Sequence, residues 1–257
     1  MKVVIFAGGR GTRISEESLL RPKPMIEIGG RPILWHIMRI YAAYGHTEFI
    51  ICLGYKGWMI KEYFVNYYHH NADLTVDLSN NSVTVHNSNA EPFKITLVET
   101  GLDTMTAGRL RRVLPYTNGE PFMLTYGDGV SNVDINALID FHKKSGRICT
   151  MTAIQATSRF GVIKMEDDGQ ITSFEEKPAD SGTWINGGFF VVQPEIADYL
   201  HEDADQVMWE CQPMDDLAKD GQIAAYRHHD FWKAMDTLRD KEELESLWEK
   251  GNAPWKF

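Results

Sequence analysis

The stretch Val3-Val-Ile-Phe-Ala-Gly-Gly-Arg-Gly-Thr-Arg13, near the start of the chain, decides the fold. Its first five residues are all apolar, which is typical of a buried strand in a parallel sheet. Glycines follow at positions 8, 9 and 11. Because glycine has no Cβ, this turn can adopt positive φ angles and let a ligand approach the backbone closely. Its backbone N–H groups predict a concave site for an anion.

Outward from this stretch, short apolar runs alternate with helical patterns through the first half of the chain. The predicted elements, strand and helix in turn, are Val3–Ala7, Ile33–Tyr44, Glu48–Leu53, Gly57–Tyr68, Phe122–Tyr126 and Val133–Lys144. Apolar strands separated by amphipathic helices indicate a parallel sheet that is covered on both faces. The predicted fold class is therefore α/β, a Rossmann-like, mostly parallel sheet flanked by helices.

Two regions depart from this alternation. Residues 73–99 contain three segments of alternating polarity around the turn Asn80-Asn81, which predicts a small antiparallel annex. Residues 150–192 are also rich in strand patterns, and the pattern becomes helical over 195–257. Since no linker, repeat or low-complexity segment interrupts the chain, we expect a single domain over residues 1–257.

The composition is that of a globular protein, and its charge argues against large polyanionic partners. Of the 257 residues, 43% are apolar and 24% are charged. The 36 acidic and 26 basic residues give a net charge of −10, without any long basic run. A nucleic-acid or anionic-membrane surface is therefore not expected, although a few cations can still bind a small anion. No apolar stretch reaches the roughly 18 residues of a membrane span.

The three cysteines indicate a reducing compartment. They lie far apart, with neither a CxxC motif nor zinc-site spacing. Cys52 and Cys149 fall inside apolar, strand-like runs, so we expect buried, reduced thiols and a cytoplasmic location. The apolar run at the N-terminus is too short for the core of a signal peptide.

The glycine turn matches neither of two common phosphate loops. Ile14 stands where a dinucleotide fingerprint needs its third glycine, and a Walker A loop would need a Gly-Lys dipeptide that the chain lacks. By itself the turn is equally compatible with a sharp bend. Arg13 and Lys23 add positive charge, and a proline on either side of Lys23 holds it in a stiff segment. This cluster suits the stabilisation of charge on a polyphosphate, with an exposed loop lysine as the alternative.

Two aspartates are candidates for holding a cation. Asp128 follows the strand predicted to end at Tyr126, at the edge where ligands of open α/β sheets bind. Asp236 precedes Thr237, which we expect to cap the last helix in a capping box with Asp240, so Asp236 is not needed for capping. Two carboxylates at strand ends would suit a hard cation such as Mg²⁺. An ordinary Asp-Gly turn is the alternative for Asp128.

Several motifs follow one another along nearly the whole chain. They are Gly9-x-Gly11-Thr12-Arg13, Lys23-Pro24, Tyr126-Gly-Asp-Gly129, Glu175-Glu-Lys-Pro178, Ile185-Asn-Gly-Gly188 and Trp232-x-x-Met-Asp-Thr237. In this order they resemble the signature of the sugar-phosphate nucleotidyltransferases. Within that family, the segments Lys23–Gly30, Met105–Leu110 and Trp248–Lys256 resemble the cytidylyltransferases that make CDP-glucose.

The resemblance implies an Mg²⁺-dependent enzyme that forms CDP-glucose and pyrophosphate from CTP and glucose 1-phosphate, to supply deoxysugars for a surface polysaccharide. It implies catalytic roles for Arg13 and Lys23, and metal binding by Asp128 and Asp236. The nucleotide-binding residues that it implies are Phe6, Ala7, Gly8, Gly9, Gly11, Thr12, Arg13, Lys23, Thr104, Arg109 and Asp128. The implied sugar-phosphate-binding residues are Gly161, Glu176, Lys177, Asn186 and Gly187. A homo-oligomer is implied as well, with a hexamer as one candidate form.

The segment 104–109 departs from the common thymidylyl and uridylyl transferases, which carry a Gly-Thr-Ala type of loop there. Thr104 and Arg109 can hydrogen-bond a pyrimidine ring or a nucleotide phosphate, and the alternative for Arg109 is a surface cation beside Arg111 and Arg112. Selection of cytosine needs acceptors that face its N4 amino group, which backbone carbonyls could supply. Three other functions remain open at this point: a thymidylyl or uridylyl transferase, a non-catalytic nucleotide-sugar sensor, and a nicotinamide oxidoreductase.

Overall fold

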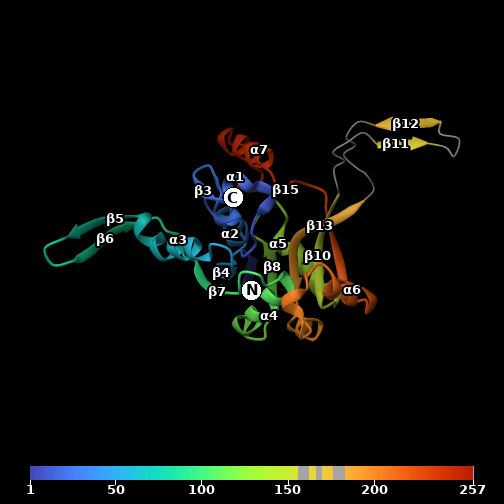
Figure 1. Cartoon of the computed structure of the whole chain (residues 1–257), viewed down its shortest axis with the longest axis horizontal. Coiled ribbons are helices and arrows are strands. Elements are labelled where there is room, and N and C mark those ends of the chain that lie inside the picture. The colour runs from blue at the N-terminus through green and yellow to red at the C-terminus, as the bar shows by residue number, and fades with distance from the viewer. Residues whose placement is uncertain (156–161, 166–169, 176–182, 257) are drawn as a thin grey trace.

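The computed structural model describes residues 1–155, 162–165, 170–175 and 183–256. Its centre is a seven-stranded sheet with the strand order β14-β10-β13-β8-β1-β4-β7 (Figure 1). The strands are β1 (Val3–Phe6), β4 (Glu48–Leu53), β7 (Lys94–Glu99), β8 (Phe122–Tyr126), β10 (Cys149–Gln155), β13 (Trp184–Val192) and β14 (Ile223–His228). Only β13 runs antiparallel to its neighbours in this sheet. The predicted α/β class with a mostly parallel sheet is confirmed.

Helices cover both faces of the sheet. The longer helices are α2 (Ile33–Ala43), α3 (Gly57–His70), α4 (Thr106–Thr117), α5 (Ile135–Ser145), α6 (Gln212–Lys219) and α7 (Leu238–Glu249). The short ones are η1 (Thr12–Ile14), α1 (Ser15–Ser18), η2 (Lys23–Met25), η3 (Pro194–Tyr199) and η4 (Ala204–Gln206). Val3 and Ile5 face a core with α2, α5 and α7, whereas Val4 and Phe6 face a second core with α4 and α6. This alternation explains why β1 is apolar throughout.

The antiparallel annex is smaller than the sequence predicts. Strands β5 (Ala72–Asp77) and β6 (Ser82–Ser88) form a hairpin around Asn81, whose φ is +54°, and the hairpin stands out from the body (Figure 1). The third predicted segment is instead β7, which pairs in parallel with β4 in the central sheet. Val98 is buried there against Phe6 and its neighbours, so burial rather than polarity alternation decides where this strand pairs.

The region 195–257 is only partly helical, which corrects the prediction for it. β14 adds to the sheet beside β10, and β15 (Trp232–Ala234) pairs with β9 (Gly129–Ser131). Such short strands show little periodicity in the sequence. Whether these segments form strands depends on their pairing with a distant strand. Two further pairs are β2 (Glu27–Ile28) with β3 (Arg31–Pro32), and β11 (Val162–Met165) with β12 (Ile171–Glu175).

The prediction of buried thiols is confirmed for two of the three cysteines. Cys52 and Cys149 are buried, and burial holds the pKa of each thiol above its ordinary value. Cys211, before α6, is exposed. Among the helices that the structure describes, none has the length and apolar character needed to cross a membrane.

Candidate active site

A cavity of about 770 Å³ opens beyond the carboxyl ends of β1 and β8. This is the edge at which open α/β sheets bind ligands. Most of the residues predicted to bind substrate or metal line it, namely Phe6, Ala7, Gly8, Gly9, Gly11, Thr12, Arg13, Lys23, Thr104, Arg109, Asp128, Asn186 and Asp236. The fold therefore brings together residues that are more than two hundred positions apart in the chain.

The glycine turn after β1 is closely packed on its protein side. A Cβ on Gly8 would lie 2.1 Å from Nη1 of Arg109, and one on Gly11 would lie 2.6 Å from Oγ of Ser18. Gly11 also has a φ of +63°, and its carbonyl accepts a hydrogen bond of 2.7 Å from the Ser18 hydroxyl. Gly9, in contrast, has open space around it. Side chains at Gly8 or Gly11 would thus displace the turn from the cavity wall.

Arg109 holds the glycine turn in place from its buried side. Its side chain is 4% exposed, which makes the alternative of a helix-surface cation wrong. The guanidinium donates hydrogen bonds to one hydroxyl and four backbone carbonyls, those of Thr100, Leu53, Gly101, Gly8 and Leu102. It therefore ties together the loops that follow β1, β4 and β7. Its predicted contact with the base or a nucleotide phosphate stays a prediction.

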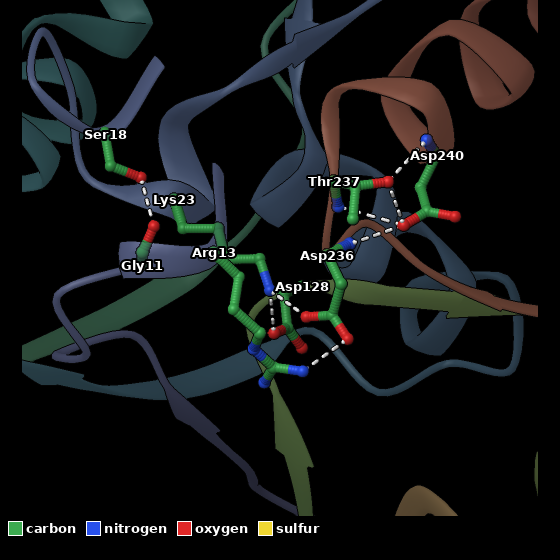
Figure 2. A network of polar contacts seen from close by, with 8 residues as sticks. All are labelled: Gly11, Arg13, Ser18, Lys23, Asp128, Asp236, Thr237 and Asp240. Carbon is green, nitrogen blue, oxygen red and sulfur yellow. Dashed lines mark hydrogen bonds and ion pairs between the residues drawn. The ribbon is translucent and has the colours of Figure 1, made fainter. Parts of the chain in front are cut away.

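Lys23 lies between the two candidate metal-binding aspartates (Figure 2). Its Nζ is 2.6 Å from Oδ2 of Asp128 and 2.7 Å from Oδ1 of Asp236. Pro22 and Pro24 flank it at the start of η2, and the lysine is 8% exposed, so it is not a loop lysine in solvent. Arg13 reaches the other oxygen of Asp236 at 2.8 Å. Two cations and two carboxylates thus form one compact network on the cavity wall.

The start of α7 leaves the carboxylate of Asp236 available for this network. Thr237 is the N-cap, and Asp240 accepts hydrogen bonds from the backbone N–H and the hydroxyl of Thr237 (Figure 2). The backbone N–H of Asp236 also donates to Asp240, at 3.2 Å. The predicted capping box is confirmed, and it orients the carboxylate of Asp236 toward Lys23.

The donor set fits a hard divalent cation that also binds substrate. Asp128 and Asp236 already converge on one positive charge, the ammonium of Lys23. In the described part of the chain no cluster of three or more His, Cys, Asp or Glu side chains could hold a metal alone. A pair of carboxylates, completed by phosphate oxygens and water, is the arrangement that Mg²⁺ commonly takes in proteins.

The residues predicted to bind a sugar phosphate are described in part. Asn186 lines the cavity, where its side chain donates to the Tyr126 hydroxyl at 3.2 Å. Gly187 accepts a hydrogen bond of 2.6 Å from the indole N–H of Trp232. A Cβ on Gly187 would meet the Thr152 carbonyl at 2.9 Å, so packing of β13 on β10 requires this glycine. Gly161, Glu176 and Lys177 lie outside the described residues.

The structure adds cavity residues for which the sequence gives little or no signal. Glu210 accepts a hydrogen bond of 2.8 Å from the Thr106 hydroxyl and also contacts the hydroxyl of Tyr126. Arg10 and Asp103, which both line the cavity, form an ion pair of 2.6 Å. Trp232 also lines the cavity and belongs to a motif quoted above. Glu210 lies in the segment Met-Trp-Glu-Cys, which matches no motif, and only the fold brings it to the cavity.

Comparison with known sequences assigns the family. The profile described as nucleotidyl transferase matches residues 2–248. The chain belongs to the nucleotidyl transferase family. It is also 53% identical to a glucose-1-phosphate cytidylyltransferase of Salmonella typhi over 257 residues, which is 100% of this chain and 99% of that one. The match places the chain in the group of the glucose-1-phosphate cytidylyltransferases. Enzymes of this family generally use a divalent metal ion.

Solved structures support the fold. HddC from Yersinia pseudotuberculosis matches with a TM-score of 0.68 and 22% identity, covering 96% of this chain and 99% of that one. A UDP-glucose pyrophosphorylase complexed with UDP-glucose matches with a TM-score of 0.69 and 17% identity, covering 97% and 98%. Membership of the nucleotidyl transferase family argues against the alternative of a nicotinamide oxidoreductase. The fold around the central sheet agrees with these solved structures.

Proposed function

We propose that this protein is an enzyme that converts CTP and α-D-glucose 1-phosphate into CDP-glucose and pyrophosphate. The observation that carries the proposal is the 53% identity, over the full length of both chains, with a glucose-1-phosphate cytidylyltransferase. The cavity supports it, because cationic side chains, two carboxylates and a glycine turn face one space. The function needs no covalent intermediate on the protein, and two of the three cysteines are buried.

The charges of the cavity assign its two ends. Arg13, Lys23, Asp128 and Asp236 gather at one end, where a triphosphate and a metal ion would be bound. The other end has exposed apolar side chains, including Met105 and Met208, beside the hydroxyl of Thr106. A flat base with polar edges suits that end. Gly8, Gly9, Gly11 and Thr12 would cradle the nucleotide between the two ends.

The reaction in this site is an in-line displacement at the α-phosphorus of CTP. The phosphate of glucose 1-phosphate attacks, the new P–O bond forms, and the bond to the departing pyrophosphate breaks on the opposite side. Because the attacking phosphate is already anionic near pH 7, no general base is required. The protein has to align two anions that repel one another. Arg13 and Lys23 would stabilise the charge that develops on the leaving pyrophosphate.

Mg²⁺ is the metal ion that we infer for this site. Asp128 and Asp236 would hold it, and when bound it would neutralise charge on the nucleotide phosphates. Since Lys23 contacts the same two carboxylates, its ammonium would move toward the phosphates when a metal ion is bound there. The two carboxylates would thus bind the ammonium of Lys23 before the substrates bind, and the metal ion afterwards.

The sugar-phosphate contacts rest on the resemblance. Lys177 would position the attacking phosphate, and Glu176 and Asn186 would hydrogen-bond sugar hydroxyls. The backbones of Gly161 and Gly187 would allow a close approach of the sugar. Among these residues, Asn186 lines the described cavity.

We further infer a cytoplasmic homo-oligomer that supplies a deoxysugar pathway for a surface polysaccharide. Exposed apolar side chains on α3 and on the β5–β6 hairpin support self-association; they are Trp58, Val65, Tyr68, Leu74, Val76, Leu78 and Val83. Light scattering coupled to size-exclusion chromatography would give the mass directly. A mass six times that of the 29.3 kDa chain would support the hexamer, and a monomer would contradict it.

The proposed activity is tested by pyrophosphate release from the purified protein with Mg²⁺ and glucose 1-phosphate, in parallel with CTP, UTP, dTTP and ATP. We expect release with CTP far above the others. Release with UTP or dTTP instead would favour a uridylyl or thymidylyl transferase on the same catalytic residues. Tight nucleotide binding without release, across a panel of sugar phosphates, would favour the non-catalytic sensor.

A further inference from the structure

We propose that the carboxylate of Glu210 is the acceptor that recognises the N4 amino group of cytosine and so determines the choice of nucleotide. The inference rests on the proposed function, because it assumes that a pyrimidine nucleotide occupies the cavity. It assigns a specificity role to a residue that the sequence motifs do not mark.

The charged groups of the cavity leave Glu210 free for this task. Four carboxylates of described residues line the cavity: Asp103, Asp128, Glu210 and Asp236. Asp128 and Asp236 pair with cations at the phosphate end, and Asp103 pairs with Arg10 where its side chain is 80% exposed. The partners that the structure gives Glu210 are neutral hydroxyls, so its negative charge is not compensated by an ion pair there.

Hydrogen bonds fix the Glu210 carboxylate as an acceptor. The Thr106 hydroxyl accepts from the backbone N–H of Trp209 at 2.7 Å and donates to Oε2 of Glu210 at 2.8 Å. Tyr126 is the second neighbour, and burial together with the nearby Glu210 raises the pKa of its phenol, which therefore keeps its proton. A half-buried carboxylate that receives the Thr106 hydroxyl bond and lies near the Tyr126 hydroxyl still has lone pairs for a further donor from the cavity.

Backbone carbonyls near the base end are turned away from the cavity. The carbonyls of Gly8, Gly101 and Leu102 accept hydrogen bonds from the buried guanidinium of Arg109. Gly8 O also accepts from the backbone N–H of Tyr55 at 3.1 Å. Since the C=O and the following N–H of a trans peptide point in opposite directions, these three peptides direct N–H donors rather than acceptors toward a ligand. This favours a side-chain acceptor for an amino group of the base.

The surroundings of Glu210 also suit the ring of a base. Met105 and Met208 line the cavity and are 46% and 47% exposed, which provides apolar surface for the face of a ring. Cytosine offers an amino donor at N4, whereas uracil and thymine offer a carbonyl acceptor at O4. A carboxylate opposite that position attracts the first and repels the second, so it selects CTP over UTP and dTTP.

The test is the substitution Glu210→Gln, which keeps size and shape. Glutamine has one acceptor oxygen, which the Thr106 hydroxyl would hold, so its amino group would face the base. We expect the ratio of kcat/KM for CTP to kcat/KM for UTP to fall by about tenfold or more, since one matched base contact discriminates to that degree. Asp103→Asn removes the same charge from the same cavity and should leave this ratio unchanged.

Equilibrium binding separates this inference from the proposed function. Titration calorimetry with CTP and UTP, without glucose 1-phosphate, measures base preference even if the protein releases no pyrophosphate. An equal loss of both affinities in E210Q would mean that Glu210 only supports the fold, and would overturn the proposal, as would a changed preference in D103N. If E210Q does not fold, Thr106→Val removes the anchor of the carboxylate, and an unchanged ratio in that variant contradicts the assignment.

Discussion

Gly8 and Arg109 are in direct contact, and each determines what the other position can hold. A Cβ on Gly8 would lie 2.1 Å from Nη1 and 2.5 Å from Cζ of Arg109. The guanidinium is buried and held by several carbonyls, so it cannot move aside. The first glycine of the turn is therefore required by packing beneath the cavity, not only by an approaching ligand.

The substitution Gly8→Ala should destabilise the protein through this contact. Overpacking of a well-packed site costs typically about 1–3 kcal/mol, and we expect the free energy of unfolding in urea to fall by that amount. Gly9→Ala is the matched control, because nothing lies within 4 Å of a Cβ there. Equal stability of the two variants would contradict the packing role of Gly8.

Arg109→Lys should be as damaging although it keeps the charge. A lysine cannot reproduce the planar fork that reaches loops after three strands, and several buried carbonyls would lose their donor. We expect the free energy of unfolding in urea to fall by an amount on the order of 3 kcal/mol. Arg111→Lys serves as control, since Arg111 is exposed and its guanidinium donates to the backbone carbonyls of the exposed residues His201 and Glu202. A wild-type stability for R109K would refute the structural role.

Lys23→Ala tests the catalytic assignment. Removal of one preorganised donor typically costs about 3 kcal/mol of transition-state stabilisation, so kcat should fall about 100-fold. Lys144→Ala, an exposed lysine on α5, should leave kcat unchanged. Circular dichroism of both variants would show that the fold is retained. A near-wild-type kcat in K23A would remove Lys23 from the reaction.

His36 predicts how stability depends on pH. Burial lowers the pKa of His36 to about 4. Its Nε2 donates to the Ile28 carbonyl at 2.8 Å, and its Nδ1 accepts from the indole N–H of Trp255 at 3.3 Å, which suits the neutral ring. The native protein therefore keeps His36 neutral while the unfolded chain binds a proton below pH 6.5, so stability falls as the pH drops from about 6.5 to about 4.

Between pH 6.5 and about pH 4, the titration of His36 lowers the free energy of unfolding by about 3 kcal/mol. His36→Gln can keep both hydrogen bonds but cannot titrate. We expect urea unfolding at pH 7.5 and pH 5 to show a smaller pH dependence in H36Q than in the unsubstituted protein. The half-buried His46 and the buried His142 stay in both proteins, so the difference in pH dependence reports His36 alone. The same pH dependence in both proteins would contradict this origin.

The sequence predicts the fold wherever periodicity and burial agree. Glu48–Leu53 and Phe122–Tyr126 are strands with the predicted bounds, because each is mostly apolar and, apart from the half-buried Glu48 and Tyr126, fully buried. The strand Lys94–Glu99 alternates in polarity, so the sequence predicts it as part of the annex, yet it pairs with β4 in the central sheet. Alternation identifies a strand but not its partner, which depends on distant segments.

The same limit applies to the candidate site. Lys23, Asp128 and Asp236 could be singled out because their local contexts, two prolines, a strand end and a capping box, each mark the position. Glu210 has no such context, and only the packing of η4 and the following segment against α4 brings it beside Thr106. The sequence marks Arg109 as a candidate site residue, but the helical pattern around it does not predict that its side chain is buried. Its hydrogen bonds to the loops therefore could not be predicted either.

The reverse reaction tests the central claim most directly, because a single substrate then carries both the base and the sugar. CDP-glucose and pyrophosphate would be mixed with the protein and Mg²⁺, and CTP formation followed by chromatography, with UDP-glucose as the comparison. We predict rapid formation of CTP from CDP-glucose, little UTP from UDP-glucose, and a strong loss of CTP formation in K23A. No CTP from CDP-glucose, at any Mg²⁺ concentration, would contradict the proposed function.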